Sequence, residues 1–343
     1  MDEATLHALL RKGMQHTASD VLFKVGQPPA FRVRGDLHYL QGDKLRPDQT
    51  KALAGIILQR SRFSGTVDEL QQFDTSYAVH GIGRYRVNVY RQRGTLALAM
   101  RSIPLRIPTF DELRVPSVAQ TLAELERGMV LVCGAAGNGK SSTLAAMVGH
   151  LNTTQRLHIV TIEDPIEFIH QDQLASISQR EIGIDTADFA TALRAALRQD
   201  PDVILVGEVR DEETMDIALK AAETGHLVLS TLHTPDVQRT MGRVVALAGA
   251  ETDARERFAD NLKAIIAQRL LPRTDGSGLI LAAEVLVVTG TARESIRKPD
   301  TNLPLKEVME RGVHPYGMQT FEMALRDLVK QGLVDVEVAR SAL

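Results

Sequence analysis

Residues 134–141 constrain this chain more than any other segment, because they form a complete phosphate-binding motif. They read Gly-Ala-Ala-Gly-Asn-Gly-Lys-Ser, which satisfies G-x-x-x-x-G-K-S/T at every fixed position. The motif lies between an apolar run at 129–133 and an amphipathic segment at 141–151. A strand, a glycine-rich turn and a helix in this order surround phosphate oxygens with backbone N–H groups and the positive end of the helix dipole. The segment therefore predicts a nucleotide site in an α/β domain.

The side chains of this motif have separate expected roles. Lys140 reaches the β- and γ-phosphates, and the Ser141 hydroxyl ligates Mg²⁺. The other positions expected to contact the nucleotide are Gly134, Ala136, Gly137, Asn138, Gly139 and Ser142. A dinucleotide-binding fold is disfavoured, because Lys140 and Ser141 stand where G-x-G-x-x-G requires its last glycine. The alternative interpretation is a glycine-rich turn that carries a lysine by chance.

Short apolar runs alternate with helical patterns around the motif. The apolar runs lie at 129–133, 157–162, 203–206 and 227–231. Their composition is typical of strands that are buried on both faces of a parallel sheet. Helical patterns fill the gaps at 141–151, 187–199 and 212–224. This alternation predicts a doubly wound α/β domain.

The last stretch of the chain is expected to be helical. One apolar stripe at helical spacing consists of Phe258, Leu262, Ile265 and Ile266. Further on, Thr320 is placed to cap a helix that ends at Gly332. The residues that this helix would bury are Phe321, Ala324, Leu325 and Leu328.

The first hundred residues predict a separate module of mixed α/β structure. Residues 84–90 alternate in polarity, so that Arg84 and Arg86 share one face of a strand and the apolar residues share the other. The next strand, at 96–103, carries Arg101. Three prolines then interrupt regular structure between 104 and 116. We therefore expect a domain at 1–103, a linker at 104–116 and a second domain at 117–343.

Two carboxylates follow predicted strands of the second domain. Glu208 follows the apolar run at 203–206, where P-loop proteins use an acid to position Mg²⁺. Glu163 lies in the segment Thr-Ile-Glu-Asp-Pro-Ile-Glu-Phe at 161–168 and is the candidate for polarising the attacking water. The alternatives are an ordinary acid at a strand end for Glu208 and a solvated acidic loop for Glu163.

Two histidines, His226 and His233, flank the apolar run that begins at 227. A metal site is disfavoured, because seven residues of separation along a strand would hold the two rings apart and no third ligand is near. The preferred interpretation is a polar pair on the γ-phosphate side, with His233 in catalysis and His226 in nucleotide binding. A purely structural role is the alternative.

Composition limits the remaining classes. Forty basic and 43 acidic residues give a net charge of −3, and aromatic residues make up 4% of the chain. Neither value favours a nucleic-acid motor, which needs basic surface and stacking side chains. A single cysteine, Cys133, permits no internal disulfide, and no apolar run reaches the roughly 20 residues of a membrane span. A soluble cytoplasmic protein is the expectation.

Together these four segments resemble the secretion ATPase superfamily, the hexameric motors of type II secretion and type IV pili. Residues 134–141 correspond to its Walker A motif and 161–168 to its Asp box. Residues 204–208 correspond to its Walker B motif and 225–233 to its His box. Their order and spacing agree with the superfamily, and the resemblance covers nearly the whole chain.

The chain is most similar to the type IV pilus retraction ATPases, the PilT/PilU group. Extension and type II secretion ATPases usually carry a four-cysteine zinc insertion, which a chain with one cysteine cannot form. The segments at 208–211, 222–226 and 317–321 also resemble the retraction group. Its Ala-Ile-Arg motif is replaced around 291–297, which leaves an accessory, PilU-like paralogue as an alternative. A type IV secretion or archaeal-type motor and a non-catalytic nucleotide-binding adaptor are further alternatives.

The resemblance implies a fold and a set of N-terminal residues at the site. The fold is a PAS-like α+β domain followed by a RecA-like P-loop ATPase domain with a helical C-terminal region. The N-terminal domain would supply arginines to the nucleotide of its own or a neighbouring subunit. The matching positions are Arg84, Arg86, Arg93 and Arg101, of which Arg86 and Arg101 are assigned to catalysis.

The resemblance also implies an assembly and a cellular role. The protein would be a homo-hexamer that hydrolyses ATP with Mg²⁺ to drive pilus retraction and twitching motility. It would work in the cytoplasm, at the inner face of the cytoplasmic membrane. The implied partners are the inner-membrane pilus platform protein and a paralogous retraction ATPase, and no nucleic acid is expected.

Overall fold

The computed structural model describes residues 1–33, 35–104, 106–248 and 251–343, which form two compact units. The first unit comprises Met1–Arg106, Glu167–Ile169 and Gly183–Asp185. The second comprises Ile107–Ile166, His170–Ile182 and Thr186–Leu343. Leu105, in the predicted linker, lies outside the described residues.

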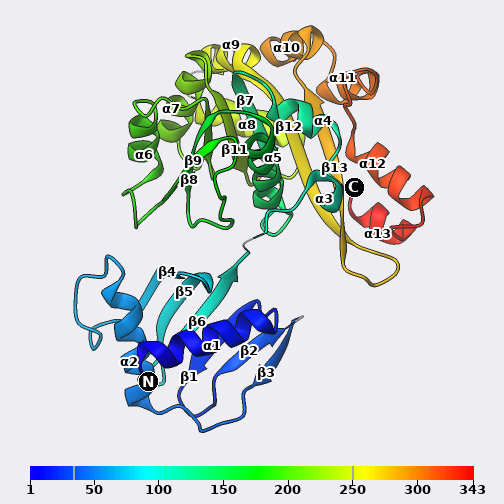
Figure 1. Cartoon of the computed structure of the whole chain (residues 1–343). Helices are drawn as coiled ribbons and strands as arrows, with labels where there is room; N and C mark the ends of the chain where they lie inside the picture. The colour runs from blue at the N-terminus through cyan, green and yellow to red at the C-terminus, as the bar shows by residue number, and fades with distance from the viewer. Residues whose placement is uncertain (34, 105, 249–250) are drawn as a thin grey trace. The chain divides into compact units, whose positions relative to one another are not determined.

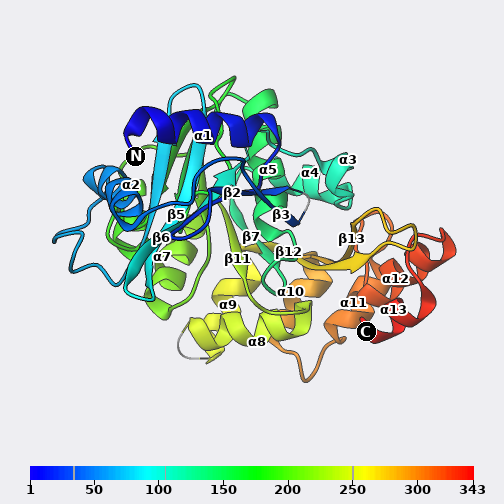
Figure 2. The same cartoon turned by 90° about the horizontal axis from the view of Figure 1, so that it is seen from below.

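The first unit is an antiparallel sheet with two helices packed on one face (Figure 1). Its elements are α1 (Glu3–Gln15), β1 (Asp20–Lys24), β2 (Ala30–Val33), β3 (Asp36–Tyr39), α2 (Pro47–Gln59), β4 (Gln72–Val79), β5 (Gly83–Gln92) and β6 (Thr95–Ile103). The strand order is β3-β2-β1-β6-β5-β4. Leu10 of α1 and Ile57 of α2 are fully buried in the core that they share with the sheet. Figure 2 shows α1 crossing the strands of this sheet.

The second unit is built on a seven-stranded sheet of order β13-β12-β7-β11-β10-β8-β9. Its strands are β7 (Gly128–Cys133), β8 (His158–Glu163), β9 (Ser176–Glu181), β10 (Val203–Val206), β11 (Leu227–Leu232), β12 (Leu262–Pro272) and β13 (Leu279–Val287). All neighbouring pairs are parallel except β12 and β13. The predicted α/β fold class is confirmed.

The helices of this unit lie on both faces of the sheet and beyond its β13 edge (Figure 1). They are α3 (Phe110–Leu113), α4 (Val118–Ala123), α5 (Lys140–Thr154), α6 (Phe189–Ala196), α7 (Glu212–Glu223), α8 (Val237–Leu247), α9 (Glu251–Asn261), α10 (Gly290–Arg297), α11 (Leu305–Arg311), α12 (Phe321–Lys330) and α13 (Val336–Ser341). The short helix α3 lies within the predicted linker at 104–116. It begins with a capping box formed by Thr109 and Glu112.

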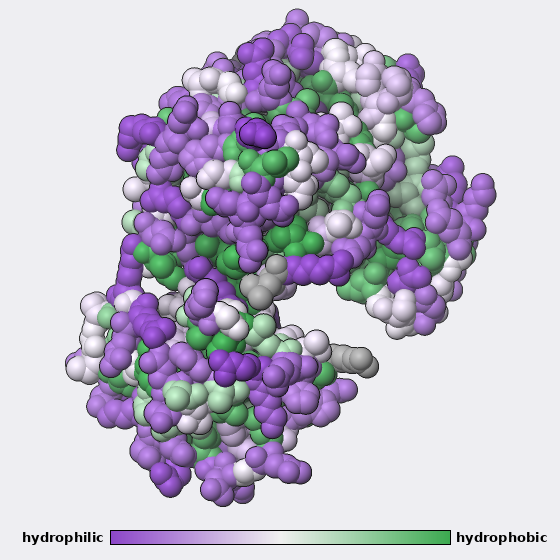
Figure 3. Space-filling model, viewed as in Figure 1, coloured by the Kyte–Doolittle hydropathy of each residue, from purple (hydrophilic) through white to green (hydrophobic). Residues whose placement is uncertain are grey.

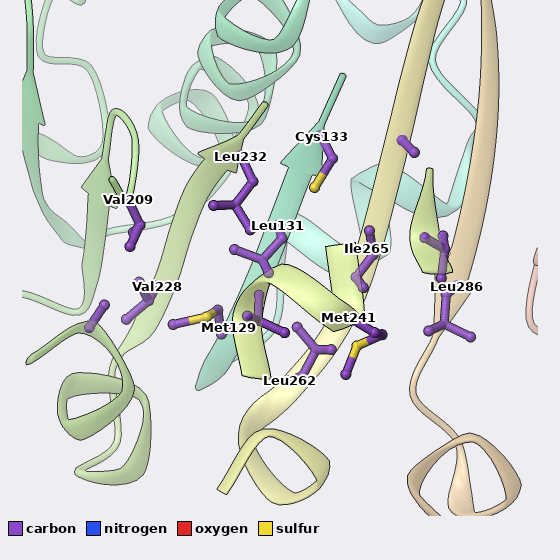
Figure 4. Packing of buried hydrophobic residues seen from close by; sticks show 14 of the residues in the cluster. Met129, Leu131, Cys133, Val209, Val228, Leu232, Met241, Leu262, Ile265 and Leu286 are labelled. Carbon is purple, nitrogen blue, oxygen red and sulfur yellow. The ribbon is translucent and has the colours of Figure 1, made fainter. Parts of the chain in front are cut away.

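Side chains of β7 point alternately to the two faces of the sheet, so the core of the second unit has two layers. Met129, Leu131 and Cys133 pack with α6, α7, α8 and α9 on one face of the sheet (Figure 4). Val130 and Val132 pack with α4 and α5 on the other. Every residue of β7 is buried, as expected for a central parallel strand covered by helices on both faces.

The predicted helical stripe through Phe258, Leu262, Ile265 and Ile266 is wrong. α9 ends at Asn261, and Leu262 begins β12, which pairs with β7. A strand that is buried on both faces shows no polar alternation, so its apolar residues also fit a helical spacing. The predicted C-terminal helix is confirmed as α12, where the Thr320 hydroxyl accepts the Met323 N–H at 3.3 Å.

Within the described part of the chain, no helix is long and apolar enough to cross a bilayer. Hydrophilic side chains dominate the face of the molecule drawn in Figure 3.

Candidate functional site

The phosphate-binding loop connects β7 to α5, as the motif predicts. Gly134, Gly137 and Gly139 have φ values of 146°, 80° and 80°, which residues with a side chain rarely adopt. A Cβ on Gly134 would also lie 2.6 Å from the Gln268 carbonyl oxygen. The loop therefore needs glycine at this position both for its backbone conformation and for its close approach to β12.

Lys140 lies inside this loop, with 7% of its surface exposed. Its Nζ donates to the carbonyl oxygens of Gly134 at 2.8 Å and Ala135 at 3.1 Å. The ammonium is thus held within the backbone turn that the motif assigns to phosphate. Ser141 and Ser142 follow it in the first turn of α5, where N–H groups are not used within the helix.

Two side-chain contacts attach the loop and α5 to β12. The Asn138 Oδ1 accepts the Leu270 N–H at 3.2 Å, and the Gln268 Nε2 donates to the Thr143 Oγ1 at 2.6 Å. Gln268 is fully buried. Sequence reasoning missed this support, because it predicted no strand here and the partners are 125 and 132 residues apart.

Glu208 lies at the carboxyl edge of the sheet, two residues after β10. Its Oε1 accepts from the Arg210 Nη2, and its Oε2 lies 3.3 Å from the His233 Nε2. Burial acts to raise the pKa of the Glu208 carboxyl, but Arg210 and His233 together outweigh it and lower this pKa below its ordinary value. Glu208 is therefore ionised at neutral pH, as a ligand of a divalent cation must be.

Glu163 is the last residue of β8, which neighbours β10. Ile162 pairs with Val206, so Glu163 and Glu208 leave adjacent parallel strands at the same edge. The Glu163 Oε1 accepts from the Thr161 Oγ1 at 2.6 Å and from the Gln179 Nε2 at 3.1 Å. The structure thus brings both predicted carboxylates to the sheet edge that carries the phosphate loop.

The two histidines lie at opposite ends of β11. His233 follows Leu232, which pairs with Cys133 just before the phosphate loop. His226 precedes Leu227, and its Nδ1 lies 3.0 Å from the Ala221 carbonyl oxygen. The two histidines are seven positions apart along this extended segment, or about 23 Å at 3.3 Å per residue. The position of His226 therefore does not fit its predicted contact with the nucleotide held by its own chain.

The predicted arginines all lie in the first unit. Arg86 and Arg101 are cross-strand partners on β5 and β6, so they share the face that α1 and α2 leave open. Arg84 lies on the same face, two residues before Arg86. Arg101 Nε donates to Asp20 Oδ1 at 2.9 Å. Arg93 is exposed at the β5–β6 turn, where its φ is 48°.

The site consists of a glycine-rich loop between a buried parallel strand and a helix, with two carboxylates and a histidine at the same sheet edge. This combination defines a P-loop nucleotide-binding protein. Comparison with known proteins specifies the family. The model of the type II/IV secretion system protein family matches residues 108–331. The chain belongs to this family and is an ATPase of its type IV pilus retraction branch.

Two relatives in Pseudomonas aeruginosa match almost the whole chain. The type IV pilus retraction ATPase PilT is 41% identical over 337 residues, covering 97% of this chain and 96% of its own length. The type IV pilus ATPase PilU is 40% identical over 336 residues, covering 96% of this chain and 86% of its own length. The crystal structure of the pilus retraction motor PilT with bound ADP has a TM-score of 0.89 at 39% identity, covering 98% of this chain and 96% of that one.

Proposed function

We propose that this protein is a motor that hydrolyses MgATP to drive type IV pilus retraction. The observation that carries the proposal is the similarity to PilT over 97% of the chain, together with an intact phosphate loop around Lys140. The second candidate is an accessory, PilU-like role in the same machine. The sequence identities support this candidate, because the chain is 40% identical to PilU and 41% identical to PilT.

Each residue at the sheet edge has a proposed part in hydrolysis. The loop N–H groups and Lys140 bind the phosphates, and Glu163 orients and polarises the attacking water. Ser141 and Glu208 offer the oxygen donors that Mg²⁺ prefers, and the ion would neutralise charge on the phosphates. His233, which contacts Glu208, would respond to the γ-phosphate.

The arginine face of the first unit supplies the remaining positive charge in this proposal. Arg86 and Arg101 lie directly opposite each other, and like charges in such a pair favour an anion between them. Arg84 and Arg93 would add contacts to the same nucleotide. The domains at 1–103 and 117–343 would then move about the linker at 104–116 as ATP is bound and hydrolysed.

The proposed assembly is a homo-hexamer. It would work in the cytoplasm, at the inner face of the cytoplasmic membrane, and transmit force to the inner-membrane pilus platform protein. A paralogous retraction ATPase would be a further partner. Nucleic acid has no part in this proposal, since the net charge of −3 gives no general attraction to it.

Replacement of the chromosomal gene by Lys140→Ala tests the proposed function. The purified variant should lose ATP turnover by at least about 100-fold, the loss seen when one hydrogen-bond donor that stabilises a transition state is removed. Cells that carry it should extend pili but fail to retract them in fluorescence imaging. Normal turnover would refute the nucleotide assignment, whereas lost turnover with normal retraction under low load would favour the accessory role.

A further inference from the structure

Three polar residues lie on one face of the sheet where β8 meets β9. Thr161 is directly opposite Gln179 in the parallel pairing of these strands. Glu163 follows Thr161 by two residues, so its side chain projects from the same face. The register of the sheet therefore places a hydroxyl and an amide next to the carboxylate that is proposed to activate water.

Both neighbours donate to the same oxygen of this carboxylate. The Thr161 Oγ1 lies 2.6 Å and the Gln179 Nε2 lies 3.1 Å from the Glu163 Oε1. Hydrogen bonds to a charged acceptor are short and strong. Two of them on one oxygen, one from the same strand and one from the next, fix the rotation of the carboxylate as well as its position.

The orientation of the Gln179 amide is determined by its other contact. The His170 backbone N–H donates to the Gln179 Oε1 at 2.9 Å. A backbone N–H can only donate and an ionised carboxylate can only accept, so the amide nitrogen must face Glu163. Burial lowers the pKa of the His170 ring to about 4, so this ring brings no charge to the contact at neutral pH.

We infer that Gln179, acting with Thr161, is a positioning residue that holds the Glu163 carboxylate in the direction required for hydrolysis. This inference rests on the proposed role of Glu163 in the proposed ATPase function. Neither residue needs to touch the nucleotide. Their loss should therefore lower kcat, because the carboxylate would sample directions that do not face the water, and should leave nucleotide affinity unchanged.

The test compares two variants that each remove one donor. Gln179→Glu keeps the side-chain shape and the acceptor for the His170 N–H, and Thr161→Val keeps the shape of threonine. Thr161→Val should lower kcat by about tenfold, the effect of one hydrogen bond to a charged group. Gln179→Glu should lower it further, because its carboxylate also repels that of Glu163. The melting temperature and the Kd for a fluorescent ATP analogue should not change.

Two further variants separate positioning from general damage. Thr161→Ser restores the hydroxyl and should restore kcat. Ser178→Ala alters the neighbouring residue of β9, whose side chain lies on the other face within 3.2 Å of His158, and should leave kcat unchanged. The deficit of Gln179→Glu should also shrink as the pH falls, because the introduced carboxyl, once protonated, can again donate to Glu163.

The inference and the proposed function fail in different ways. Wild-type kcat in both Gln179→Glu and Thr161→Val, with an inactive Glu163→Gln, would overturn the positioning role and leave the ATPase mechanism intact. Equal losses of kcat and of nucleotide affinity, or a lower melting temperature without rescue by Thr161→Ser, would assign both residues a structural role instead. Normal turnover in Glu163→Gln would refute the proposed catalytic role of Glu163 itself.

Discussion

Glu163 and Glu208 leave adjacent strands at the same sheet edge but have different partners. The Glu163 carboxylate accepts from Thr161 and Gln179, whereas the Glu208 carboxylate accepts from the Arg210 guanidinium and contacts His233. The Thr161 and Gln179 donors orient Glu163 for its proposed action on the attacking water. The Glu208 carboxylate can exchange its cationic partner for a divalent ion.

This difference predicts distinct consequences for the two amide substitutions. Glu163→Gln should bind MgATP normally and lose turnover by at least about 100-fold, since the amide keeps the shape and loses the charge. Glu208→Gln should weaken the dependence of nucleotide binding on Mg²⁺. Titration of a fluorescent ATP analogue with and without Mg²⁺, combined with phosphate release, measures both. If Glu163→Gln hydrolyses ATP normally, the second glutamate of the 161–168 segment, Glu167, is the next candidate.

At this scale the sequence predicts residues within contiguous motifs better than residues brought together by folding. Lys140 belongs to a motif whose spacing alone specifies its surroundings. Gln179 could not be identified, because its contact with Glu163 depends on the register of β8 against β9. The predicted nucleotide contact of His226 depends in the same way on folding, because His226 precedes β11 and the phosphate loop lies at the other end of that strand.

At the scale of elements, four parallel strands follow the predicted apolar runs closely, and β10 matches its run at every residue. The β12–β13 hairpin was missed, although β12 supports the phosphate loop through Asn138 and Gln268. Its residues are apolar on both faces, so their pattern does not distinguish a buried strand from a helix. The segment forms a strand because it pairs with β7, which is more than 120 residues away in sequence.

Glu284 is a buried carboxyl on β13 that connects the β12–β13 hairpin to the first residue of α8. It is 8% exposed, and its Oε2 accepts the Val237 N–H at the start of α8 at 2.8 Å. Burial raises the pKa of this carboxyl, and the N–H groups of Val237 and Phe321 offset only part of the rise. The stability that Glu284 contributes is therefore complete below the ordinary carboxyl pKa and decreases as the pH rises through the elevated value.

Glu284→Gln should remove this dependence, because a neutral amide can still accept the Val237 N–H. The melting temperature of the variant relative to wild type should increase from pH 4 to pH 8, by about 2–4 °C for each kcal/mol. The matched control is Glu310→Gln, at an exposed position on α11, whose difference from wild type should stay constant. A constant difference for Glu284→Gln as well would show that its pKa is ordinary in the folded protein.

At the scale of the whole molecule, the proposed site draws on both compact units. The arginines lie in the unit that contains β5 and β6, and Glu163 lies in the unit that contains the phosphate loop. Under this proposal, one active site would need both units, from a single chain or from two neighbours in the proposed ring. An arginine that stabilises phosphoryl transfer is worth about 10³–10⁵ in kcat, so its absence is easily measured.

Mixing two inactive proteins distinguishes these arrangements. One is the double variant Arg86→Ala/Arg101→Ala, and the other is Glu163→Gln. If arginines act between subunits, mixed rings contain junctions where an intact Glu163 meets intact arginines, and we expect part of the wild-type ATPase activity to return. If each site uses the arginines of its own chain, no mixture can build a complete site. Background activity in rings that native mass spectrometry shows to be mixed would therefore eliminate the arrangement between subunits.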